Sequence, residues 1–339
     1  MTTKTKARLA VLALLVPSFA SAQAPKETLL ALSKRDHTLS IVDPSSMKVL
    51  SKVPVGEDPH EVIASTDGRT AYVSNYGGGA YNTLAVIDLA EQKPLPAIDL
   101  GPLRGPHGLD FMGGKAWFTA EAAKAIGSYD PVSKKVDWIL GTGQNRTHMI
   151  LVSGDLKRII TTNVSSGTVS IIEKTPGRAE GPPAGPPPGG DWDEIVVKVG
   201  NGSEGFDVSP DGKEIWVANA QDGTISVIDI AAKKVTDTLA ANVGGANRLK
   251  FTPDGHKVFV SSLRLGTVAV LDGSTHKEIK RIEVGHGAAG IVMQPDGSRA
   301  FVACTPDNYV AVIDLKSLEV TGHLDVGQQP DGLAWAVMH

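Results

Sequence analysis

Three histidines and one glutamate, spaced at near-regular intervals, are the side chains best suited to chemistry in this sequence of 339 residues. They are His60, His107, His148 and Glu204, separated by 47, 41 and 56 residues. Imidazole and carboxylate groups bind divalent transition metals such as Zn, Cu, Fe, Ni or Mn, and three protein ligands with one open position form a catalytic metal site. We therefore expect these four residues to be metal ligands if the fold brings them together.

The elements that must position these residues are short strands in a repeated pattern. An alternating apolar strand that ends in an acid occurs seven times, for example at Ile225–Asp229. It follows an Asp-Gly turn and another alternating strand, such as Ile215–Asn219, and this arrangement predicts a hairpin because glycine accepts the positive φ of the turn. Each repeat predicts four strands, A to D, of which Gly332–Val337 is one strand A and Lys234–Leu239 one strand D.

These repeats predict a closed ring of seven blades. Positions equivalent to His60, at the start of strand A, recur at intervals of 41 to 56 residues, and propeller blades take about 40–45 residues. The sequence ends on a strand A and begins, at Thr28–Ser33, on a second strand, so its two ends complete one blade. The prediction is an all-β, seven-bladed β-propeller with four strands per blade, as a single domain over residues 23–339. The C-terminal strand A would pair with the N-terminal strands B to D and leave no free edge.

Two of the predicted B strands also resemble a known repeat. Tyr72–Asn75 reads Tyr-Val-Ser-Asn and Trp216–Asn219 reads Trp-Val-Ala-Asn, and both follow a turn of the Asp-Gly-Lys/Arg type and precede Val-Ile-Asp. The sequence therefore resembles YVTN-type β-propeller repeat proteins, including the exported YncE-like propellers, over nearly all of residues 23–339. The motif is weaker in other blades, as at Ile160–Asn163. The resemblance implies the fold and export, and it assigns no substrate.

The first residue of each strand A is expected to face the central channel. In order these residues are His60, His107, His148, Glu204, Asn247, Ala289 and Asp331. Arg146, Arg248 and His286 lie in or beside the loops that lead into strand A, and Tyr76 and Glu121 fall beside the B–C turns on the same face. The predicted ligand-binding residues are Arg146, Asn247, Arg248, His286 and Asp331. Because arginine forks match carboxylates and phosphates, we expect a small polar or anionic ligand.

Other interpretations of these residues stay open. The histidines can also line a metal-free ligand pocket, or they can be structural side chains that hydrogen-bond to channel water, and the arginines can be solvated rim charges. A bound metal would acidify its water and polarise a carbonyl, with Glu204 or Asp331 as a base, which suits hydrolysis or isomerisation. The sequence assigns no catalytic residue. The alternative function is a non-catalytic protein–protein interaction scaffold of the cell envelope.

The composition and the short motifs exclude several other classes of protein. The chain is 41% apolar, with one cysteine, a formal net charge of −4 and 5% aromatic residues. One thiol cannot form a disulfide within the chain, and an acidic chain with few aromatics does not suit nucleic acid. The sequence contains no nucleophile elbow of the Gly-x-Ser-x-Gly type, no Walker loop and no Rossmann glycine pattern after a strand.

The two segments that do not fit the repeats are the N-terminus and one Pro-rich stretch. Residues 1–22 predict a signal peptide, because a basic start precedes an apolar run and the cleavage pattern Ala20-Ser21-Ala22. We expect a periplasmic or secreted monomer without a membrane span after signal removal. Residues 174–192 predict a loop between strands C and D of the fourth blade, on the face opposite the histidines, where it or the blade edges would carry the binding of an envelope protein.

Overall fold

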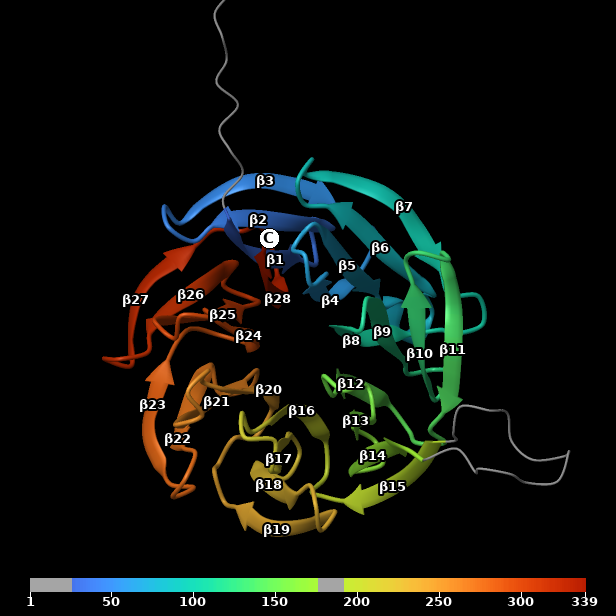
Figure 1. The fold of residues 1–339 in the computed structure, drawn as a ribbon. Coiled ribbons are helices and arrows are strands. Elements are labelled where there is room, and N and C mark those ends of the chain that lie inside the picture. Colours follow the sequence, from blue (N-terminus) through green and yellow to red (C-terminus); the bar gives the residue numbers. More distant parts are fainter. Residues whose placement is uncertain (1–25, 176–191) are drawn as a thin grey trace, which may run out of the picture.

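The computed structural model describes residues 26–175 and 192–339, and these form seven four-stranded antiparallel sheets around a central axis (Figure 1). The predicted seven-bladed propeller is confirmed. The predicted signal peptide at residues 1–22 and residues 176–191 of the predicted Pro-rich loop lie outside the described residues. In the part of the chain that is described, no helix is long and apolar enough to cross a membrane.

In each blade, the first strand is innermost and the fourth lies at the rim (Figure 1). The blade shared by both chain ends contains β28 (Pro330–Val337), β1 (Glu27–Ser33), β2 (Thr38–Asp43) and β3 (Lys48–Pro54). The second contains β4 (Pro59–Ala64), β5 (Thr70–Asn75), β6 (Thr83–Asp88) and β7 (Lys93–Asp99), with the short 3₁₀ helix η1 (Gly77–Gly79) after β5. The third contains β8 (Pro106–Met112), β9 (Lys115–Ala120), β10 (Ala125–Asp130) and β11 (Lys135–Gly141).

The remaining four blades repeat this order. The fourth contains β12 (Thr147–Val152), β13 (Arg158–Asn163), β14 (Thr168–Lys174) and β15 (Trp192–Lys198). The fifth contains β16 (Ser203–Val208), β17 (Glu214–Asn219), β18 (Thr224–Asp229) and β19 (Lys234–Leu239). The sixth contains β20 (Ala246–Phe251), β21 (Lys257–Ser262), β22 (Thr267–Asp272) and β23 (Glu278–Glu283). The seventh contains β24 (Ala288–Met293), β25 (Arg299–Cys304), β26 (Tyr309–Asp314) and β27 (Glu319–Leu324).

The ring closes by pairing of the last strand with the first. β28 runs antiparallel to β1, with Ala336 opposite Thr28 and Ala334 opposite Leu30. This bears out the predicted closure by a C-terminal strand A on N-terminal strands B to D. The middle strands of every blade are buried on both faces, and their Val, Ile, Leu and Phe side chains pack between neighbouring blades. The core therefore consists of seven clusters, one between each pair of neighbouring blades.

Each innermost strand leaves the regular pairing pattern near its start. In the second blade Pro59 pairs with Asn75 but the next pair is Val62 with Val73, so the second and third residues of β4 have no partner on β5. The register shifts at the same place in the other blades. The interruption leaves the second residue of each strand A free of the sheet and places it at the channel.

A hydroxyl group replaces the missing pairing in several blades and reaches the next blade. Thr119 Oγ1 on β9 accepts a hydrogen bond from the backbone N–H of Gly108 at 2.9 Å and donates to the carbonyl of His148 at 2.8 Å. Thr162 donates to the carbonyl of Glu204 in the same way at 2.8 Å. The backbones that carry the predicted site residues are thus tied to one another, blade to blade.

Glycine at the third position of strand A lets successive innermost strands approach closely. A Cβ at Gly108, Gly205, Gly290 or Gly332 would lie 2.1 to 2.5 Å from a backbone carbonyl oxygen of the next blade. No ordinary contact is that short, so a side chain there would push two blades apart. The glycines set how tightly the ring closes around its axis.

The substitution Gly290→Ala should therefore destabilise the ring, because its Cβ would lie 2.1 Å from the carbonyl oxygen of Asp331. Overpacking of this kind costs about 1–3 kcal/mol, and urea denaturation would measure the loss. Gly322→Ala on the rim strand β27 is the matched control, since nothing lies within 4 Å of the added carbon. Equal midpoints for the two variants would show that the close approach does not constrain the ring.

Candidate functional site

The structure brings the three predicted histidines together at one end of the channel. The ring centroids of His60 and His107 lie 5.0 Å apart, and those of His107 and His148 lie 3.9 Å apart. The Tyr76 ring, at the end of β5, packs edge-on at 4.9 Å from His60 and 5.2 Å from His107. Since each histidine is the second residue of a different strand A, the cluster depends on the packing of three successive blades.

The turn that leads into each strand A has a left-handed backbone. The residue two positions before the channel residue has a φ between 48° and 73° in all seven blades. These residues are Asp58, Gly105, Arg146, Gly202, Gly245, Gly287 and Gln329. Glycine takes this conformation without strain, and the three side chains that replace it each carry a cost of about 1 kcal/mol or more.

The same turn positions a second set of channel residues. The carbonyl of each left-handed residue accepts a hydrogen bond from the backbone N–H of the residue that follows strand B. These following residues are Lys34, Tyr76, Glu121, Val164, Ala220, Leu263 and Thr305. Among them, Lys34, Tyr76 and Glu121 lie on three successive blades, beside the histidines.

His148 is a buried cation between two carboxylates. Its Nδ1 lies 2.5 Å from Oε1 of Glu121, and its Nε2 lies 2.9 Å from Oε1 of Glu204, a charge contact that is not aligned as a hydrogen bond. Burial alone would lower the pKa of His148, but the charge of Glu204 and the bond to Glu121 outweigh it and raise that pKa to about 9. Burial raises the pKa of Glu204, but the charge of His148 overcomes this and lowers it to about 2. The imidazole is protonated at neutral pH.

Arg146 and Tyr76 complete the surroundings of these carboxylates. The Tyr76 hydroxyl donates to Oε2 of Glu121 at 2.5 Å, and burial together with this acceptor raises the pKa of Tyr76. The Arg146 guanidinium lies 3.6 Å from Glu121 and 3.9 Å from Glu204, beyond hydrogen-bond distance, and its side chain is 43% exposed. Arg146 is therefore attracted to the carboxylates but keeps N–H donors for another partner.

His107 is a neutral imidazole with an unused polar atom. It is 3% exposed, and burial together with the charge of His148 holds its pKa well below the usual range. Among the described residues its Nδ1 has no hydrogen-bond partner. A buried polar atom without a partner costs free energy, so a ligand or water at this atom would be stabilised.

His60 faces an ammonium group. Lys34 Nζ lies 2.9 Å from Nε2 of His60, 3.2 Å from Asp331 and 3.8 Å from Asp58. The hydrogen bond from His60 to Asp58, at 3.2 Å, is the main reason that the pKa of Asp58 falls to about 2. The Lys34 ammonium thus occupies the place where the imidazole nitrogen of His60 and the two carboxylates converge.

One ion pair closes the channel below the histidines. Arg248 on β20 donates from its NH2 group to Oε1 of Glu61 on β4, and its NH1 group donates to the carbonyl of Asn247 at 3.0 Å. β4 and β20 lie on opposite sides of the ring (Figure 1). The side chains of Arg248 and Glu61 are only 6% and 11% exposed. The pair therefore crosses the axis and separates the histidine end from the rest of the channel.

The predicted ligand-binding residues differ in their positions. Arg146 and Asp331 lie in the cluster with the histidines and Glu204. Arg248 lies in the channel but is engaged by Glu61, and Asn247 beside it is buried. The contact described for His286 is with Asp307 at 3.0 Å, and its side chain is 88% exposed.

The arrangement gives no support to the predicted metal site. Within residues 26–175 and 192–339, no group of three or more His, Cys, Asp or Glu side chains is placed to hold a metal ion. Both nitrogens of His148 face carboxylates, and Lys34 lies where a cation would meet His60. The metal-ligand role of His60, His107, His148 and Glu204 stays a prediction.

Sequence reasoning found some of these residues and missed others. Tyr76 and Glu121 were expected on this face without a defined contact, whereas Lys34, Asp58 and Glu61 were not expected in the site. The signal for Lys34 was its position directly after strand B, equivalent to Tyr76 and Glu121. The signal for Asp58 was a non-glycine residue where most blades have glycine.

The model of the YNCE-like beta-propeller family matches residues 191–299, which confirms the resemblance to this type of propeller. No curated protein sequence matches the chain. A functionally unknown protein from Desulfotomaculum acetoxidans has a similar structure, with a TM-score of 0.74 and 14% identity over 92% of this chain and 99% of that one. Hydrazine synthase from Kuenenia stuttgartiensis is similar with a TM-score of 0.69 and 19% identity, over 85% of this chain and 92% of that one. A proposed 6-phosphogluconolactonase from Bacteroides fragilis is similar with a TM-score of 0.72 and 16% identity, over 95% of this chain and 100% of that one. At these identities the likeness shows the fold.

The charge of His148 predicts a specific loss of stability at high pH. Because its folded pKa is about 9 and the ordinary value is 6.5, its contribution is complete below pH 6.5 and disappears as the pH rises through 9. At about 1.36 kcal/mol per pKa unit this amounts to roughly 3 kcal/mol. The effect of His148→Gln on the free energy of unfolding should therefore be larger at pH 6 than at pH 9.5.

Urea denaturation at the two pH values measures this difference. His286→Gln, which removes an exposed histidine that also faces an aspartate, is the control and should have a small effect at both values. An effect of His148→Gln that does not change with pH would mean that the buried imidazole is neutral.

Proposed function

We propose that this YNCE-like β-propeller binds a small polar ligand with a carboxylate or phosphate group at the histidine end of the channel. The observation that carries the proposal is Arg146, whose half-exposed guanidinium stands over a buried network at the axis. Tyr76, His107 and His60 form the adjoining polar surface.

Arg146 occupies a position that the fold would give to glycine. Four of the seven blades have glycine at this left-handed turn, whereas Arg146 has a φ of 56°. The left-handed conformation costs a residue with a side chain roughly 1–2 kcal/mol. Strained backbone is found at functional sites when the side chain is needed at that place. Asp58 and Gln329 take the same conformation at the equivalent turns of two other blades, so the turn places the guanidinium at the site while the case for its role rests on its free donors.

The surrounding charges leave the guanidinium available. Both nitrogens of protonated His148 face Glu121 and Glu204, at 2.5 and 2.9 Å, whereas Arg146 stays more than 3.5 Å from either carboxylate. An incoming carboxylate or phosphate can thus take a two-pronged hydrogen bond from Arg146 without breaking a hydrogen bond within the protein.

Other polar groups at this end of the channel fit the polar remainder of such a ligand. The unpartnered Nδ1 of His107, on the neighbouring blade, is one such group. The ring of His60 and the ammonium of Lys34 lie two and three blades from Arg146. The ion pair of Arg248 and Glu61 forms the floor of the site and limits its depth. These features favour a compact, hydrophilic acid.

Replacement of Arg146 by glycine tests the proposal. Phosphate, citrate, gluconate and 6-phosphogluconate, the last suggested by the name of one structural neighbour, are the probes, measured by thermal shift and calorimetry. Hydrogen bonds to charged groups contribute about 1.5–3 kcal/mol. Arg146→Gly should therefore lower the affinity for the tightest-binding probe roughly ten- to hundredfold. Glycine relieves the left-handed strain, so we expect the variant to fold with its stability changed by no more than about 1 kcal/mol.

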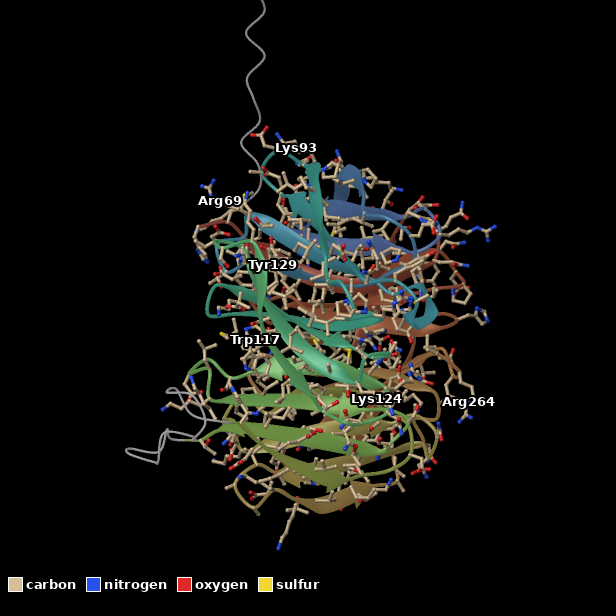
Figure 2. The ribbon with its side chains drawn as sticks, turned by 90° about the vertical axis from the view of Figure 1, so that its right-hand side faces the viewer. Arg69, Lys93, Trp117, Lys124, Tyr129 and Arg264 are labelled. Atoms are coloured by element: carbon tan, nitrogen blue, oxygen red, sulfur yellow. The ribbon has the colours of Figure 1, made fainter. Side chains whose placement is uncertain are left out.

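Arg264→Gly is the matched control, because Arg264 is exposed on the same face of the disc. Figure 2 shows Arg264 and Lys124 at one face and Arg69 at the opposite one. The control should bind the probe like the parent protein. If no probe binds, or if both variants lose the same affinity, the proposed function is wrong.

A further inference from the structure

A second chamber of the channel lies on the other side of the ion pair between Arg248 and Glu61. It is a cavity of about 580 Å³, lined by the later residues of strand A in all seven blades and open toward the face of the A–B turns. Ser153 and Gly154, from one such turn, stand at its border. Its volume is in the range of about 300–1,000 Å³ typical of small-molecule sites.

The walls of this chamber are mainly apolar. Met112 on β8, Met149 on β12 and Met293 on β24 contribute flexible thioether side chains, and Ile63 on β4 and Leu151 on β12 also line the chamber. All five are only partly buried, although they are apolar. Water needs two to four polar partners to be held in a cavity. Water in this chamber is therefore held weakly, and an apolar molecule would displace it at a gain.

The charged groups of the chamber are already engaged. Arg248 and Glu61 bind each other. Asp110 accepts hydrogen bonds from the backbone N–H groups of Phe111 at 2.8 Å and Val152 at 2.7 Å.

The remaining wall charge, the Lys250 ammonium, lies 3.7 Å from Asp207. The lining thus carries two basic and two acidic groups, each near a partner. A charged ligand would lose its hydration here. Arg248, Glu61 and Lys250 already face opposite charges, and the Asp110 carboxylate is held by two backbone N–H groups.

We propose that this lower chamber binds an uncharged, mainly apolar small molecule. The site is separate from the polar site at the histidine end, because the buried ion pair lies between the two. Methionines on three blades let the walls adapt to the shape of the ligand.

The neutral fluorophore N-phenyl-1-naphthylamine tests the chamber directly. We expect saturable binding with enhanced fluorescence, and displacement by 1-decanol at lower concentration than by decanoate or decylamine, which have the same chain with a charged head. Preferred displacement by either charged compound would overturn the inference of an uncharged ligand. An absence of saturable binding would overturn the site.

Two variants of the walls locate the bound molecule. Ala334→Phe on β28 fills the chamber, and Met149→Gln makes its wall polar at similar length; each should weaken fluorophore binding at least tenfold. Ala232→Phe, at an exposed C–D turn on the same face, is the control and should bind like the parent protein. If Ala334→Phe fails to fold, Met149→Gln decides. Unchanged affinity in a folded wall variant would show that the fluorophore binds elsewhere and the proposal is wrong.

Discussion

The close approach of the seven innermost strands is the constraint on which the rest of the structure depends. Glycines such as Gly205 allow one strand A to touch the backbone of the next. At the same level each strand A leaves the pairing with strand B for two residues. The channel side chains are therefore held by contacts between blades, through hydroxyls such as Thr119 and Thr162, and not by a sheet of their own. Their geometry is a property of the whole ring.

The narrow channel has an electrostatic consequence. Side chains from opposite blades meet where water is scarce, so a charge there must find a partner of opposite sign. His148 meets this requirement because it is protonated and lies between Glu121 and Glu204. His107, whose ring centroid is 3.9 Å from that of His148, stays neutral. Two histidines at equivalent positions of neighbouring blades thus have opposite protonation states. The difference arises from the charge of Glu204 on β16 and from Glu121, which follows β9 and reaches the imidazole of His148 in the next blade.

The sequence predicted the architecture well because propeller signals are local. Asp-Gly turns and alternating strands are read from a few neighbouring residues, and their repetition determined the blade count and the ring of channel residues. The partners of those residues could not be read in this way. Glu61 and Arg248 are 187 positions apart in the sequence and meet only because the ring closes between them. The metal prediction used the types and order of the side chains, and it had no means to foresee that Lys34 would lie against His60.

The ion pair between Arg248 and Glu61 also limits the diameter of the ring. An arginine side chain has a maximum reach, so the contact between β20 and β4 sets an upper limit on the distance between opposite blades. A ring widened by one blade, or opened at the junction of β28 and β1, would leave a buried guanidinium and a buried carboxylate without partners. Separating such a pair costs several kcal/mol. One contact between two side chains therefore penalises a wider or an opened ring.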